Sequence, residues 1–238
     1  MICLQGMQKL TLLDYPGRVA CTIFTGGCNF RCPFCQNSEL LPCHKQGNLE
    51  VDEVLKFLEQ RRKKDLLDGV CITGGEPLLQ EKLDVFLRQI KEMGYAVKLD
   101  TNGSFPDKLQ ELVNMQLVDY VAMDIKNSPA RYAETTGTTG LYHSAVQQSV
   151  EFLLKGSVPY EFRTTIVKEF HTAEDMRAIA EWIAGAEAYY LQSFVDSDQV
   201  LQSGLHAYTA QELEAFRQIV LPKIPSAKLR GIDLNEHN

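Results

Sequence analysis

The sequence has no long apolar segment. No run of about 18 apolar residues, the least expected of a membrane-spanning helix, occurs in its 238 residues. The first residues also lack the basic region and following apolar stretch of a secretory signal peptide. We therefore expect a cytoplasmic protein with no membrane partner.

An excess of positive charge is missing as well. The chain carries 24 Lys and Arg against 31 Asp and Glu, a formal net charge of −7 at pH 7. Proteins that bind nucleic acid neutralise its phosphates with Lys and Arg, so this balance argues against nucleic acid as a main partner. Hydrophobic residues make up 45% and charged residues 23%, which excludes a disordered or collagen-like chain.

Cysteine is the unusual residue type. The chain has 7 of them, an odd number, and all lie in its first third: Cys3, Cys21, Cys28, Cys32, Cys35, Cys43 and Cys71. A disulfide framework would be spread along the chain and evenly paired. Clustered thiols in a reducing compartment instead indicate metal binding or catalysis.

Short apolar runs alternate with amphipathic stretches along the chain. We expect strands over residues 18–24, 69–73, 95–99, 120–125, 160–167 and 189–194, followed in turn by helices over 51–66, 78–93, 106–115, 141–154, 173–184 and 209–220. Such alternation implies parallel strands joined by right-handed crossovers. A closed barrel of eight units usually needs about 250 residues. Six units therefore predict an α/β fold, a partial (β/α)6 TIM-like barrel, in a single domain over residues 1–238 with its core at about 18–220.

Three cysteines follow the first predicted strand at the spacing C-x₃-C-x₂-C: Cys28, Cys32 and Cys35. Three thiolates in one short loop can bind one face of a cubane iron–sulfur cluster. Because a cubane has four irons, one iron then stays open to a substrate or cofactor. Phe34, inside the same loop, can shield such a cluster or stack on the ring of a ligand.

A structural zinc site is the alternative for this loop. Zinc needs a fourth ligand, which Cys43 or His44 could supply. Cys21 and Cys71 differ from the triplet because each lies inside an apolar strand, where a buried, packing thiol is expected. Cys3 has no clear context.

The cysteine spacing, followed by Gly74-Gly75-Glu76-Pro77 after the second strand, resembles the signature of the radical S-adenosylmethionine (SAM) superfamily over residues 18–194. Within it the chain is similar to the glycyl-radical-enzyme activating enzymes, and most of all to the activating proteins of anaerobic ribonucleoside-triphosphate reductase. Segments 10–17, 24–37, 100–103 and 123–126 carry this likeness. The family usually has His where this chain has Gln36, a position that is not a cluster ligand. With only Cys43 between Cys35 and Gly74, a second cluster domain does not fit.

The resemblance implies a [4Fe–4S] cluster on Cys28, Cys32 and Cys35, with SAM bound to the open iron. An external one-electron donor such as flavodoxin or ferredoxin would reduce the cluster. SAM would then be cleaved to methionine and a 5′-deoxyadenosyl radical, which would remove a Cα hydrogen from a glycine of the partner glycyl radical enzyme. The cofactors supply the hard chemistry, and the protein supplies binding and orientation.

Two loops after the second and third strands are expected to bind SAM. Gly74, Gly75, Glu76 and Pro77 follow one strand, where glycine lets the backbone approach the methionine moiety closely. Glu76 would accept from the SAM ammonium or anchor the loop. Asp100, Thr101 and Asn102 follow the next strand and would bind the ribose or help to hold a cation. The alternatives are a plain turn for the first loop and an Asx-type turn for the second.

Further contacts are expected from later strands. Asp124 and Lys126 alternate at the end of the fourth strand, so their side chains point the same way. By analogy with the family both lie at the SAM site, with Lys126 also near the incoming protein loop. The alternative is an ion pair on the rim, which would contribute little.

The remaining expected ligand contacts are Phe34, Gln36, Arg163 and Gln192. Arg163 suits a carboxylate or a ribose, although a surface ion pair would explain it nearly as well. Gln192 stands where related enzymes often place a His near the adenosine. The remaining histidines, at 143, 171, 206 and 237, are expected to be solvated.

Other functions stay open at this stage. One is a radical SAM enzyme that acts on a small molecule, and another is an activase of a different glycyl radical enzyme. A third is a non-enzymatic iron–sulfur or zinc module that transfers electrons or docks a partner.

Overall fold

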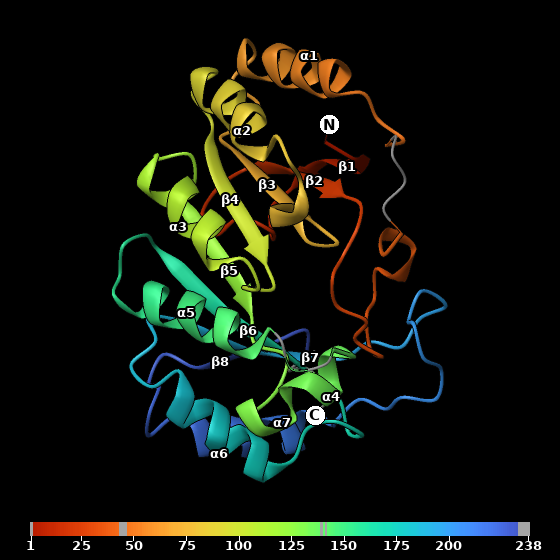
Figure 1. The fold of residues 1–238 in the computed structure, drawn as a ribbon, viewed down its shortest axis with the longest axis vertical. Helices are drawn as coiled ribbons and strands as arrows, with labels where there is room; N and C mark the ends of the chain where they lie inside the picture. The colour runs from red at the N-terminus through yellow and green to blue at the C-terminus, as the bar shows by residue number, and fades with distance from the viewer. Residues whose placement is uncertain (1, 43–46, 139, 141, 233–238) are drawn as a thin grey trace, which may run out of the picture. The chain divides into compact units, whose positions relative to one another are not determined.

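A computed structural model describes residues 2–42, 47–138, 140 and 142–232 (Figure 1). The chain divides into two compact units. The first comprises Met1–Asn29, Glu39–Ala122 and Ser157–Pro159, and the second comprises Phe30–Ser38, Met123–Gly156 and Tyr160–Asn238. The division falls inside the cysteine loop, so that Cys28 belongs to the first unit and Cys32 and Cys35 to the second. The single domain over residues 1–238 stays a prediction.

Four strands form the sheet of the first unit in chain order: β1 (Leu4–Thr11), β2 (Ala20–Thr25), β3 (Gly69–Gly74) and β4 (Ala96–Thr101). β1 runs antiparallel to β2, whereas β2, β3 and β4 are parallel. Thr22, Cys71 and Lys98 are register partners across the three parallel strands. Because side chains alternate along a strand, this row points to one face of the sheet.

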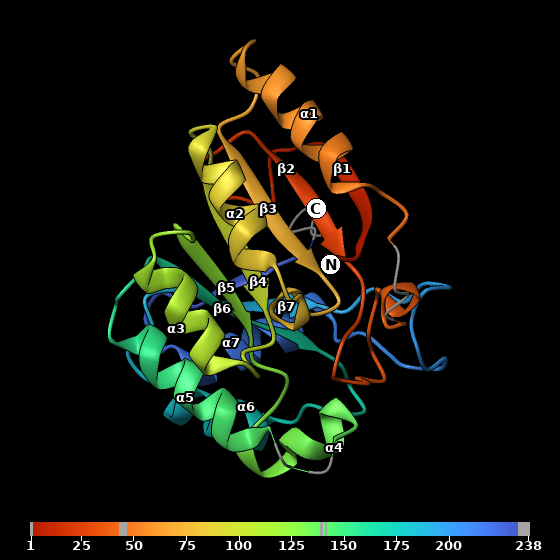
Figure 2. The ribbon, with the colours of Figure 1, turned by 45° about the horizontal axis from the view of Figure 1, so that its top comes forward.

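Helices α1 (Val51–Arg62), α2 (Leu83–Glu92) and α3 (Pro106–Asn114) belong to the first unit. In α2 the buried residues are Leu83, Phe86, Leu87 and Ile90, which helical spacing places on one stripe. α1 and α2 lie side by side over the parallel strands (Figure 2). Short 3₁₀ turns occur at η1 (Ser38–Leu40) and η2 (Pro77–Leu79).

Strand β5 (Tyr120–Asp124) begins in the first unit and ends in the second. The second unit continues with η3 (Pro129–Arg131), α4 (Tyr132–Thr136), α5 (His143–Leu154), β6 (Tyr160–Ile166), α6 (Ala173–Trp182), β7 (Tyr189–Ser193), α7 (Ala210–Val220) and β8 (Lys228–Arg230). β6, β7 and β8 are parallel neighbours in that order. α6 and α7 pack against each other, and each begins with a capping box, formed by Thr172 with Asp175 and by Thr209 with Glu212.

The six predicted strands are confirmed, with ends that differ by one or two residues. The helix predicted over 78–93 is wrong at its start, because α2 begins at Leu83. Before it, Pro77–Leu79 form the turn η2, and the amide of Gln80 accepts from Cys3 N and donates to Gly26 O, both at 2.8 Å. Strands β1 and β8 and helix α4 are additions that the sequence did not predict. In the described part of the chain, none of the helices is long and apolar enough to cross a membrane.

Candidate active site

The first unit brings two of the predicted loops together just past its strand ends. Gly74 is the last residue of β3 and has φ of +126°, a region that favours glycine. A Cβ on Gly74 would lie 2.2 Å from Thr25 O, and a Cβ on Gly75 would lie 2.1 Å from Gly27 O. The two glycines are therefore required because the backbone packs closely against the segment that leads to Cys28. The sequence had instead suggested a close approach of this backbone to a ligand.

Glu76 anchors this loop from within the protein. Its side chain is fully buried. One carboxylate oxygen accepts from Leu78 N and from the Thr101 hydroxyl, both at 2.9 Å, and the other accepts from Asn102 N at 2.7 Å. A buried carboxylate needs such donors, and these three connect the Gly-Gly-Glu-Pro loop to the end of β4. Of the two roles expected for Glu76, the structure shows the anchor.

Asn102 continues the connection toward the cysteine loop. Its Oδ1 accepts from Ser104 N at 3.0 Å and from the Ser104 hydroxyl. Its Nδ2 lies 3.0 Å from Asn29 Oδ1 and 3.9 Å from Cys28 Sγ. The amide of Asn29 donates in turn to the Ser104 hydroxyl at 2.9 Å. The loops after β2 and β4 are thereby held together by one polar network that is partly buried.

Asp100 lies beside Lys98, a residue that the sequence patterns did not single out. The ammonium of Lys98, which is 1% exposed, donates to Asp100 Oδ1. Cys71 Sγ lies 3.6 Å from the same oxygen and 4.0 Å from Lys98 Nζ. Cys71 is buried as predicted, but its thiol belongs to a polar cluster rather than to apolar packing alone. Lys98 and Asp100 are two residues apart on β4, as Asp124 and Lys126 are along the chain. This two-residue spacing of opposite charges is the sequence signal that would have identified Lys98.

The second unit brings Asp124, Lys126 and Arg163 together. Arg163 Nε donates to Asp124 Oδ1 at 2.9 Å, and Lys126 Nζ donates to Asp124 Oδ2 at 2.8 Å. Burial by itself would raise the pKa of Asp124, but the charges of Arg163 and Lys126 outweigh it and hold that pKa well below its usual range. Burial would lower the pKa of Lys126, but the Asp124 charge raises it above its ordinary value. The three groups therefore stay ionised and carry one net positive charge.

Phe34 is buried against His171. Their ring centroids are 5.9 Å apart, and Phe34 also contacts Phe170 at 5.6 Å. The prediction that His171 is solvated is wrong, because it is fully buried between β6 and α6. Val167 N donates to His171 Nδ1 at 3.1 Å, so Nε2 carries the proton and donates to Lys126 O at 2.9 Å. Burial lowers the pKa of His171, although hydrogen bonds to the Lys126 and Val167 carbonyl groups act against it.

The part of the cysteine loop in the second unit is fixed by backbone hydrogen bonds. Cys35 N donates to Cys32 O at 3.0 Å, which closes a turn around Phe34. Residues that follow β7 hold this turn, since Leu201 N donates to Cys35 O and Gln202 N donates to Pro33 O. Gln36 adds to this contact, because its side-chain amide donates a hydrogen bond to Val195 O at 2.8 Å.

The other predicted residues lie as follows. Pro77 opens the turn η2 and is buried. Gln192 lies on β7 in register with Thr165 on β6 and Arg230 on β8. Within the described residues, no three side chains of Cys, His, Asp or Glu are gathered closely enough to hold a metal ion. Cys43, His44 and His237 lie outside the described residues, so the zinc alternative for the loop stays a prediction.

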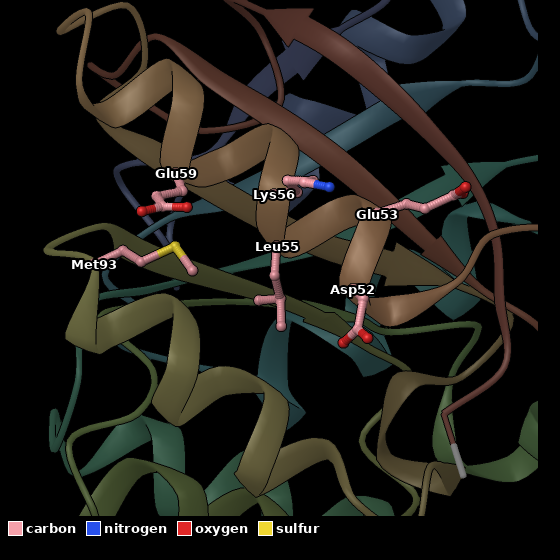
Figure 3. A pocket seen from close by; sticks show the side chains of 6 residues that line it. All are labelled: Asp52, Glu53, Leu55, Lys56, Glu59 and Met93. Atoms are coloured by element: carbon pink, nitrogen blue, oxygen red, sulfur yellow. The ribbon is translucent and has the colours of Figure 1, made fainter.

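A pocket lies elsewhere in the first unit, on helix α1 and the C-terminal end of α2 (Figure 3). Figure 3 shows its lining side chains: Asp52, Glu53, Leu55, Lys56, Glu59 and Met93. The lining includes three acidic side chains on an exposed helix face and none of the motif residues. We assign it no role in the candidate site.

Parallel strands that end in loops carrying polar, glycine and cysteine residues are the arrangement in which α/β enzymes place their chemistry. The family model of the radical SAM superfamily matches residues 22–183. The chain belongs to the radical SAM superfamily and has the α/β partial-barrel fold predicted for it. It is therefore a radical SAM enzyme, and its cofactors are a [4Fe–4S] cluster and SAM.

Two relatives and one solved structure are similar to this chain. A protein of Methanocaldococcus jannaschii, named as a glycyl-radical enzyme activating enzyme, is 32% identical over 92% of this chain and 85% of its own length. The pyruvate formate-lyase-activating enzyme of Clostridium pasteurianum is 33% identical over 52% of each chain. The structure of Streptococcus suis SuiB bound to S-adenosylmethionine superposes with a TM-score of 0.68 at 14% identity, covering 87% of this chain and 49% of that one, which supports the fold alone.

The chemistry of the cysteine loop fits an iron–sulfur cluster. The loop carries three thiols at the expected spacing, and none of Cys28, Cys32 and Cys35 is in a disulfide within the described chain. The amide of Asn102 is aimed at Cys28 Sγ, and hydrogen bonds to cluster sulfurs are a usual part of iron–sulfur sites. That these three thiols hold the cluster stays a prediction.

Proposed function

We propose that this chain is a radical SAM activase that abstracts a Cα hydrogen from a glycine of a partner glycyl radical enzyme. The observation that carries the proposal is the similarity to the M. jannaschii protein, because it extends over 92% of this chain and 85% of that one. Similarity confined to the cysteine loop would point only to the superfamily. When bound, the cluster and SAM supply the 5′-deoxyadenosyl radical that the reaction needs.

The cysteine loop and the two loops after β3 and β4 would position the cluster and the SAM methionine moiety. Cys28 provides one thiolate, and Cys32 and Cys35 provide the other two from the same loop. Gly74 and Gly75 fix the backbone next to that loop, and Glu76 fixes the end of β4 relative to it. The buried hydrogen bonds of Glu76 make this framework rigid before any ligand binds.

The charged triad of the second unit would recognise the charged end of SAM or of the partner loop. Asp124 is paired with both cations, so the triad as a whole carries one net positive charge that would attract an anionic group. Lys126 holds its proton strongly, because Asp124 raises its pKa. It therefore acts as a fixed charge and hydrogen-bond donor rather than as a base.

The partner that we favour is anaerobic ribonucleoside-triphosphate reductase. This choice rests on the overall resemblance expected for segments 10–17, 24–37, 100–103 and 123–126, and not on a residue that would recognise the partner. An external one-electron donor such as flavodoxin or ferredoxin would supply the electron, and the reaction would take place in the cytoplasm.

The test uses anaerobically reconstituted protein with dithionite, SAM and the purified reductase. We expect a glycyl-radical EPR signal that disappears when the reductase glycine is replaced by alanine, and also with the activase variant Cys28→Ala. SAM cleavage without a radical on the reductase, but with a radical on another glycyl radical enzyme, would contradict the choice of partner. Turnover of a small molecule with no radical on any protein would contradict the activase.

A further inference from the structure

Asn102 faces a cysteine rather than the solvent. Its side chain follows β4, is 5% exposed, and has Nδ2 3.9 Å from Cys28 Sγ. Asp100, Thr101 and Asn102 were all expected to contact SAM. In the described interactions, Asn102 is the one of the three that contacts Cys28 Sγ.

The orientation of the Asn102 amide is fixed by its neighbours. Ser104 N is a backbone donor, so the atom of Asn102 that it contacts at 3.0 Å must be the oxygen. The amide nitrogen therefore points to the other side, where its two hydrogens face Asn29 Oδ1 at 3.0 Å and Cys28 Sγ. Rotating the amide by 180° would put an N–H group against Ser104 N and an oxygen against the sulfur.

The backbone of Asn102 is fixed as well. Glu76 Oε2 accepts from Asn102 N at 2.7 Å, and this carboxylate is completely buried. The side chain cannot swing toward a ligand without losing the buried contact to Ser104 and the partly buried contact to Asn29. Leaving such groups unpaired is costly, so the donor stays directed at Cys28.

We propose that Asn102 is a positioning residue that donates an N–H···S hydrogen bond to the Cys28 thiolate and thereby raises the reduction potential of the cluster. The inference rests on the proposed cluster at Cys28, Cys32 and Cys35. Reduction adds one electron to the cluster, which passes from the 2+ to the 1+ state, and this increases the negative charge on its sulfurs. A donor next to a sulfur stabilises the reduced state more than the oxidised one.

The test measures the cluster potential without SAM. Wild type, Asn102→Leu and Asn102→Asp are reconstituted, iron content is determined, and the 1+ EPR signal is followed against ambient potential set with dithionite and mediators. Asn102→Leu removes the donor at similar size, whereas Asn102→Asp keeps the oxygen that accepts from Ser104 N. For both we expect about a tenfold lower ratio of reduced to oxidised cluster at a fixed potential, equal to 59 mV for a one-electron couple.

A matched control makes the same substitution far from the loop. Asn114 is the exposed last residue of α3, so Asn114→Leu should keep the wild-type potential. Potentials of Asn102→Leu and Asn102→Asp equal to that of wild type would overturn the inference. So would a shift that appears only after SAM is added, because Asn102 would then act on SAM.

A measurement on the wild type covers the case in which the variants assemble no cluster. With ¹⁵N placed in asparagine side-chain amides, pulsed EPR of the reduced cluster should show a nitrogen coupling, and its absence would overturn the inference.

The experiments distinguish failure of the proposed function from failure of this inference. If the potentials are as expected but no glycyl radical forms on any partner, the activase alone is contradicted. Unchanged potentials with a normal glycyl radical would contradict only the role of Asn102.

Discussion

Arg163 on β6 donates from its Nε to Oδ1 of Asp124 on β5, and the two atoms are 2.9 Å apart. The second oxygen of Asp124 is taken by Lys126 at 2.8 Å. Asp124 is thus a carboxylate shared between two cations, one on a neighbouring strand and one two residues along its own chain. Arg163 therefore has a structural role as an ion-pair partner of Asp124, in addition to any contact with a ligand.

Replacing Arg163 by methionine should weaken the triad. The change leaves Asp124 with Lys126 alone, so we expect the pKa of Asp124 to rise and the free energy of unfolding of the metal-free protein to fall by about 2 kcal/mol at pH 7. Urea denaturation measures this. Arg177→Met is the control, because Arg177 pairs with Glu174 on the surface and should change stability by less than about 0.5 kcal/mol. An equal loss in the two variants would contradict the special position of Arg163.

A methyl group on Gly75 should disturb the cysteine loop. Its Cβ would lie 2.1 Å from Gly27 O, a backbone atom next to Cys28, so something must move. For Gly75→Ala we expect about 1–3 kcal/mol lower stability and less iron bound per chain after reconstitution. Gly6→Ala is the matched control, because its nearest atom would be Phe24 Cδ2 at 3.9 Å. If Gly75→Ala retained wild-type stability and iron, the close packing of the two loops would not matter.

Lys98 should be needed to neutralise Asp100. Lys98→Met leaves a largely buried carboxylate next to Cys71 without its ammonium, and we expect a loss of about 3–5 kcal/mol in the free energy of unfolding. The double variant Lys98→Met with Asp100→Asn removes the uncompensated charge and should recover most of that loss. Denaturation curves of both decide the question, and equal destabilisation would show that the pair contributes through packing only.

Protonation of His171 should make stability depend on pH. Burial lowers its pKa in the folded state below the ordinary 6.5. As the pH falls through 6.5, the unfolded chain therefore takes up a proton that the folded chain does not. The stability that the neutral ring confers is present above pH 6.5 and is lost below it, by up to about 1.4 kcal/mol per pH unit.

Urea denaturation at several pH values between 5 and 7.5 measures this loss. His171→Gln has no group that titrates there, so its curve should be flatter over the same range. Identical slopes for the two proteins would show that another group is responsible.

Patterns along the chain predicted the parts of the site that depend on local spacing. Alternation placed Asp124 and Lys126 on one side, and their side chains are in contact. Position at strand ends brought Glu76, Thr101 and Asn102 together, and the structure shows them hydrogen-bonded. Both rules follow from the two-residue repeat of a strand and from parallel strands that end at one edge.

Features that depend on distant packing could not be predicted in this way. The prediction that His171 is solvated was wrong. The ring of His171 packs against Phe34, a residue that lies far from it in the sequence. Strand β1 has only Leu4 and Thr11 buried, at its two ends, and its apolar residues Met7 and Leu10 do not alternate regularly with polar ones, so its sequence has no strand pattern. The start of α2 depends on Gln80, whose side chain forms hydrogen bonds with Cys3 N and Gly26 O.

The burial of Cys21 has a consequence for cluster assembly. Burial raises the pKa of its thiol to about 12, so at the pH of an iron and sulfide reconstitution it stays protonated, and a protonated thiol does not bind iron. Cys28 and Cys35 are partly exposed by contrast. Cys21 is therefore not expected to compete for iron, and iron bound in excess of one cluster would have to be sought at another thiol.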